Sequence, residues 1–132
     1  MGGEKKFQES GGFSEYEYKA VGMTKNGIKI LEKVDGGSAN LPIHSNTPFT
    51  AYAVRDSKTA ELKQISIYGG PDGRQKIKDL DWSHKHTNPD GKVFLLGQIH
   101  VQTYKGISQH SKYARKPSKK EKRIVMIARY GA

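Results

Sequence analysis

The sequence contains no cysteine, and this absence excludes several kinds of site. Without thiols the chain can form no disulfide scaffold, no thiolate metal site and no cysteine nucleophile. It also lacks an apolar run of membrane-spanning length and the apolar core of a signal peptide. We therefore expect no membrane partner. The compartment stays open, because exported domains can also lack cysteine, and a cytoplasmic site of action is our first expectation.

Hydrophobic residues are also scarce, at 34% of the 132 residues, whereas 27% are charged. The apolar residues nevertheless cluster in alternating runs, which is typical of a folded chain rather than a disordered one. The length suits one domain with one core. We predict a flexible, glycine-rich segment at residues 1–12, followed by a single α+β domain over residues 13–132.

Positive charge is abundant, with 23 Lys and Arg against 13 Asp and Glu and a formal net charge of +10. An excess of this size in a small domain indicates a polyanionic partner such as nucleic acid. Tyr104 and Tyr113 lie near the most basic stretch and suit stacking on bases, with RNA favoured over DNA. The alternative is a charged run that only faces water. The candidate nucleic-acid contacts in this stretch are Lys112, Arg115, Lys116, Lys119, Lys120, Lys122 and Arg123.

Alternating apolar residues predict a small twisted antiparallel sheet of about four strands, connected by short turns. A C-terminal helix is expected after Ser118, because Glu121 three residues later completes a capping box. The rival interpretation is a short strand at 124–127. The main predicted strands are 49–55, 61–68, 74–82 and 93–104, and 27–34 is a further candidate.

Residues 73–86 hold two acids, two histidines and four cations. Asp79 and Asp81 are two apart on a predicted strand, so their side chains share one face, and Leu80 points to the other. His84 and His86 follow the end of this strand. A loop there would bring both imidazoles towards the carboxylates.

A fifth candidate, His100, lies between Gln98 and Gln102 on the polar face of the strand predicted at 93–104. A histidine flanked by two glutamines suits the wall of a site. An exposed sheet face is the equally weighted alternative, because antiparallel sheets commonly leave one face in water.

Three chemical interpretations of this cluster compete: a metal-independent ribonuclease, a metal-dependent nuclease, and a cluster without catalytic function. In the first, the ribonuclease needs a general acid, a general base and cations near the phosphate, and histidines titrate in the right range. Carboxylates would orient the imidazoles. In the third interpretation nothing is catalysed, and the acids pair with nearby lysines. The acid–base candidates are His84, His86 and His100, the orienting acids are Asp79 and Asp81, and the phosphate contacts are Arg74, Lys76 and Lys78.

The second interpretation is a divalent metal ion held by carboxylates and imidazoles. Its ligands would come from Asp79, Asp81, His84 and His100. We place it behind the metal-independent model, in which no cofactor is needed.

The run from Tyr68 to His84 contains a glycine–aspartate turn and then Lys78-Asp79-Leu80-Asp81-Trp82-Ser83-His84. It resembles small C-terminal domains of bacterial polymorphic toxins and related domains attached to prophage head-region proteins of Gram-positive bacteria. The resemblance covers about residues 62–102 and implies a toxin-like domain acting on nucleic acid. By position it singles out Asp79, Asp81, His84 and His100. The pattern departs at Gln102, where a histidine is common, which weakens the metal interpretation.

Our leading expectation is a nucleic-acid-directed domain, most simply a ribonuclease-like toxin or phage-encoded effector. An acidic immunity protein would then be a further partner. The alternative is a non-catalytic basic binding module of a prophage or mobile element.

Overall fold

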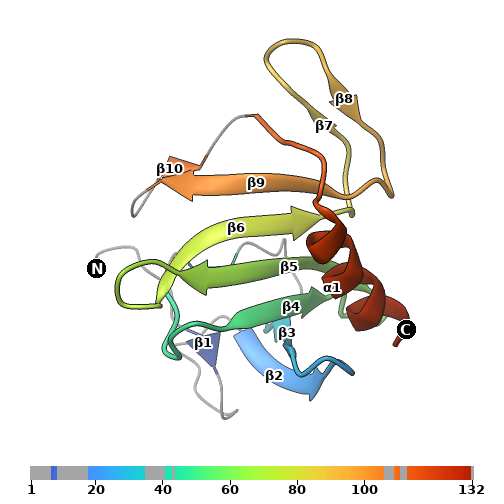
Figure 1. Ribbon diagram of the computed structural model, residues 1–132. Coiled ribbons are helices and arrows are strands. Elements are labelled where there is room, and N and C mark those ends of the chain that lie inside the picture. Colours follow the sequence, from blue (N-terminus) through green and yellow to red (C-terminus); the bar gives the residue numbers. More distant parts are fainter. Residues whose placement is uncertain are drawn as a thin grey trace.

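One large β-sheet with a C-terminal helix on one face makes up the computed structural model, which confirms the α+β class (Figure 1). The structure describes residues 7–8, 18–34, 41–42, 44–105, 109–110 and 113–131. The segment expected to be flexible, 1–12, lies outside these residues except for 7–8, and so does Lys112. Among the helices in the described part, none has the length and apolar character needed to cross a membrane.

Six strands of five to eight residues form the body of the sheet, and a two-residue strand lies at each edge. The order is β1-β2-β3-β4-β5-β6-β9-β10, and β7 and β8 form a separate hairpin. The edge strands are β1 (Phe7–Gln8) and β10 (Gln109–His110), and the hairpin strands are β7 (His86–Thr87) and β8 (Val93–Phe94). The longer strands are β2 (Tyr18–Met23), β3 (Lys29–Lys33), β4 (Ala51–Arg55), β5 (Leu62–Gly69), β6 (Gln75–Asp81) and β9 (His100–Lys105).

The estimate of about four strands was too low, and the sheet is not a simple meander. β4, β5 and β6 pair antiparallel in sequence order, as expected, but β3 and β4 are parallel. The chain between those two strands runs from 34 to 50, which is long enough for the crossover that a parallel pair needs. β2 escaped prediction because four of its six residues are exposed and show no clear alternation.

The strand predicted at 93–104 is in fact two strands separated by a turn. Gly97 has a φ of 91°, a left-handed conformation that glycine adopts readily, and the Gln98 N–H donates to the Leu95 carbonyl at 2.9 Å. Leu95 and Leu96 are exposed, so this part of the apolar run is not a core strand. The turn makes β9 begin at His100.

Helix α1 (Lys119–Tyr130) begins at the predicted capping box, so the rival strand is wrong. The Glu121 N–H donates to Ser118 Oγ at 3.1 Å, and the Ser118 N–H donates to a Glu121 carboxylate oxygen at 2.8 Å. The helix packs on the sheet near the ends of β4, β5 and β6 (Figure 1). The core beneath it consists of Ile28, Ala53, Ile65, Leu80, Trp82, Val101 and Val125.

The opposite face of the sheet changes character across its width. Over β2, β3 and β4 it is apolar, with Tyr18, Leu31 and Tyr52 in a second cluster. Over β6 and β9 the same face carries the polar side chains of Asp79, Asp81, His100 and Gln102. Those polar residues form the candidate site.

Candidate functional site

The site begins with the pairing of two strand residues at one end of the sheet. Asp81 ends β6 and stands opposite His100, which begins β9. One step further along the same face, Asp79 stands opposite Gln102. The predicted placement of both aspartates on one face is therefore confirmed. Leu80 points to the helix side, where it is fully buried.

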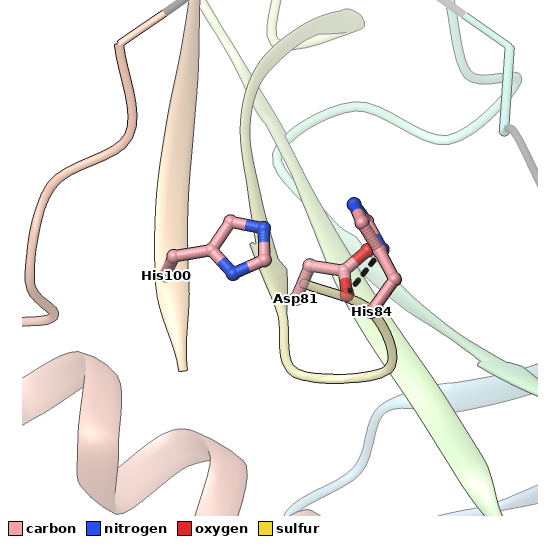
Figure 2. A group of neighbouring side chains, drawn as sticks. All are labelled: Asp81, His84 and His100. Carbon is pink, nitrogen blue, oxygen red and sulfur yellow. Dashed lines mark ion pairs between the residues drawn. The ribbon is translucent and has the colours of Figure 1, made fainter. Parts of the chain in front are cut away.

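The chain turns sharply after Asp81 and returns an imidazole to it. The Ser83 N–H and hydroxyl both donate to Asp81 Oδ1, at 2.8 and 3.1 Å, which forms the short Asp turn typical of such positions. This turn puts His84 Nδ1 3.2 Å from Asp81 Oδ1. The carboxylate is 7% exposed and the imidazole 55% exposed, and the second ring nitrogen of His84 points away from Asp81 (Figure 2). A buried acid thus orients an accessible histidine.

His100 is fully buried, and neither of its ring nitrogens has a hydrogen-bond partner. Among the described residues, these are the only buried side-chain nitrogen or oxygen atoms left without one. The ring of His84 lies edge-on to it, with centroids 5.2 Å apart, and that of His86 stacks on it at 5.2 Å. Three imidazoles therefore meet, and the central one lacks hydrogen bonds.

The β7–β8 hairpin covers His100. His86 and Phe94 are paired across the hairpin, and both rings contact His100. Asn88 anchors the hairpin through two hydrogen bonds with the backbone of Ala114, of 2.7 and 2.9 Å, and its Oδ1 is 2.9 Å from His86 Nε2. This anchor holds His86 against His100.

Burial lowers the pKa of His100, and the neighbouring imidazoles of His84 and His86 act in the same direction. The charge of the Asp81 carboxylate opposes the lowering of this pKa. A lowered pKa favours the neutral form of the ring, and a neutral imidazole has a lone pair to offer.

Asp81, His84 and His100 can bring one ligand atom each to a common point, with all three atoms within 4.8 Å of one another. Figure 2 shows the three side chains converging from the end of β6, the following turn and the start of β9. Two imidazoles and one carboxylate form a donor set found in several transition-metal sites. Asp79, which we expected to be a ligand or an orienting acid, is not in this group.

Asp79 belongs instead to a buried polar network further along the face. Its carboxylate accepts hydrogen bonds from the hydroxyls of Ser66 and Tyr104, at 2.5 and 2.6 Å, and lies 3.4 Å from Lys76 Nζ. Lys76 is 1% exposed. Burial lowers the pKa of its ammonium, and the charge of Asp79 opposes that shift. Asp79 and Lys76 therefore form a buried ion pair with each other.

Two further cations of the predicted phosphate set have carboxylate partners. Lys78 donates to Glu121 at 2.6 Å, and Arg115 binds both oxygens of the same carboxylate at 2.8 and 2.9 Å. Arg74 is exposed at the turn before β6. Besides Arg115, which is also exposed, the other exposed members of the set are Lys116, Lys119, Lys120, Lys122 and Arg123.

Some of these cations line a groove beside the histidines. Lys116 and Lys122 share a hollow of about 440 Å³ with Lys92 and Phe94. Phe94 also contacts His100, with ring centroids 5.7 Å apart. Phe94 therefore belongs both to the lining of the basic groove and to the surroundings of His100.

Sequence reasoning missed Asn88, Lys92 and Phe94. The turn signal at Asn88-Pro89-Asp90-Gly91 was visible, and it could have indicated a hairpin between the short runs on either side. The continuous apolar run after Lys92 instead favoured one long strand. Only the folded chain shows that the hairpin closes over His100.

The chain matches no known protein-family model, and neither the curated proteins nor the solved structures compared with it include a match.

Proposed function

We propose that this domain acts on nucleic acid and cleaves its phosphodiester backbone at the cluster of Asp81, His84 and His100, as a ribonuclease-like toxin or phage-encoded effector would. The observation that carries the proposal is the pair in which buried Asp81 holds Nδ1 of the exposed His84 at 3.2 Å. A carboxylate in that position fixes the orientation of the ring and leaves the other nitrogen for proton transfer.

The reaction that suits this pair is cleavage of RNA by its own 2′-hydroxyl. The cluster accepts the proton of that hydroxyl, the 2′-oxygen forms a bond to phosphorus, and the bond from phosphorus to the 5′-oxygen breaks. The departing 5′-oxygen then takes up the proton that His84 has accepted, so charge and atoms balance. DNA lacks the 2′-hydroxyl and would need water as the nucleophile.

Phosphate binding is the role we propose for the basic groove. Lys92, Lys116 and Lys122 converge on one hollow, where they would neutralise backbone charge near the cluster. Lys76, Lys78 and Arg115 have no part in this proposal, because each lies beside a carboxylate. The phosphate-binding set is therefore smaller than the sequence predicted, and it includes Lys92.

The test is cleavage of end-labelled RNA and DNA oligonucleotides, with and without chelator. We expect RNA cleavage that falls at least 100-fold in His84→Ala and in Asp81→Asn. His44→Ala is the matched control, because His44 pairs with Gln75 at the far end of β6, roughly 20 Å from Asp81. Cleavage unchanged in both site variants would refute the site, and no cleavage of either polymer, with metal ions supplied or withheld, would refute the function.

A second candidate function is non-catalytic binding of nucleic acid. It is favoured by the exposed cations Lys119, Lys120 and Arg123, which lie on α1. Binding through such a surface weakens steeply with salt. Salt-sensitive binding without cleavage, lost when these three residues are changed to Gln, would support this function instead.

A further inference from the structure

We infer that Asp81, His84 and His100 form a binding site for one divalent transition-metal ion, with open coordination positions left for water or substrate. This inference deepens the proposed function and uses the same cluster, but metal binding does not depend on cleavage activity. It differs from the metal site considered from the sequence, because Asp79 is not a ligand.

The geometry of the three side chains supports a shared ion. Their ligand atoms already lie within 4.8 Å of one another. Imidazole nitrogens and carboxylate oxygens bind Zn²⁺ at about 2 Å, so ligand atoms around one ion stand a little over 3 Å apart. Asp81 Oδ1 and His84 Nδ1 are at 3.2 Å, which is that spacing. The other ligand atoms lie no more than 4.8 Å apart, so a contraction of at most about 1.5 Å would complete the set.

The burial of His100 is the independent observation. A fully buried imidazole without a hydrogen bond at either nitrogen is unfavourable, and buried polar groups in folded proteins are nearly always satisfied. A metal ion would satisfy one of these nitrogens.

The burial of His100 also argues against direct acid–base work on a polymer. A ring with no exposed surface cannot touch a phosphodiester, whereas an ion held between His100 and the exposed His84 can. In that arrangement His84 would act as a ligand rather than as a base, and the ion would supply the base by lowering the pKa of a bound water molecule.

The donor types define the class of ion. Two imidazole nitrogens favour Zn²⁺, Fe²⁺, Co²⁺ or Ni²⁺ over Mg²⁺ and Ca²⁺, which prefer oxygen. Three protein ligands leave at least one position open, as in catalytic rather than structural sites. The missing histidine at Gln102 does not affect this set, because Gln102 pairs with Asp79 and not with Asp81.

The test is titration calorimetry of chelator-treated protein with Zn²⁺, alongside the visible spectrum of a Co²⁺ complex. We expect one ion per chain, no detectable Mg²⁺ binding, and affinity reduced at least tenfold in Asp81→Asn and His100→Leu. His44→Ala, at the far end of β6, should bind as the wild type does. Equal Zn²⁺ affinity in wild type, Asp81→Asn and His100→Leu would overturn the inference, as would absence of Zn²⁺ binding in the wild type.

The outcomes separate this inference from the proposed function. Stoichiometric Zn²⁺ binding without cleavage of RNA or DNA would uphold the metal site and end the nuclease proposal. Cleavage that persists in chelator, together with no Zn²⁺ binding, would uphold the nuclease proposal and end the metal site.

Discussion

His100 stands directly opposite Asp81 in the pairing of β9 with β6, yet the two side chains share no hydrogen bond. The Asp81 carboxylate is bound instead by Ser83 and His84. The result is a buried, neutral imidazole beside a buried carboxylate whose partners all come from the turn that follows it. This relationship places the reactive groups at the end of the sheet, and it leaves His100 energetically unsatisfied.

Replacing His100 with leucine should make the metal-free protein more stable. Leucine has a similar volume and no polar atom to bury, so we expect the free energy of unfolding to rise by about 1 kcal/mol. Urea unfolding in chelator measures it, with His44→Leu as the control at a histidine outside the cluster. A loss of stability greater than about 2 kcal/mol would instead indicate that the ring makes hydrogen bonds in solution.

Asp79→Asn should strongly destabilise the fold. It removes the charge beside Lys76, which is 1% exposed, and an unpaired buried charge costs about 3 kcal/mol or more. Adding Lys76→Met should recover much of that loss, because the two changes are coupled. Denaturant unfolding of both single variants and the double variant measures the coupling, and strictly additive losses would contradict the ion pair.

Glu121 should make stability depend on pH in the acidic range. The hydrogen bonds from Arg115 hold the pKa of the Glu121 carboxyl well below its usual range, and Lys78 and the Ser118 N–H add to the effect. Because the folded pKa lies below the unfolded value of about 4.3, the stabilisation is complete above about pH 5 and is lost as pH falls further. We therefore expect the free energy of unfolding of Glu121→Gln at pH 7 to be about 2 kcal/mol lower than that of the wild type.

The difference between wild type and Glu121→Gln should shrink steadily between pH 5 and pH 2, because in this range the unfolded chain takes up a proton at Glu121 and the folded chain does not. Thermal unfolding across this range measures it. Glu61→Gln is the control, because Glu61 is an exposed residue outside the helix. A difference that stays constant down to pH 2 would show that the ion pairs do not cause it.

Local patterns predicted the elements that depend on near neighbours. The capping box at Ser118 and Glu121 started the helix where expected, because both partners lie within one turn. Side-chain alternation placed Asp79 and Asp81 together, because it is a property of any strand. The apolar run at 93–104 led to the wrong prediction of one long strand, because hydrophobicity alone does not reveal a left-handed turn at Gly97.

The sequence by itself determined the basic charge, the sheet-and-helix class and the shared face of the two aspartates, since these follow from composition and from residues close in the chain. Only the tertiary structure decided which acid meets the histidines. Asp81 joins His100 because β6 and β9 pair in that register, while Asp79 meets Lys76 and Tyr104. Strand register and the folding back of the β7–β8 hairpin are long-range choices, which depend on the packing of the whole chain.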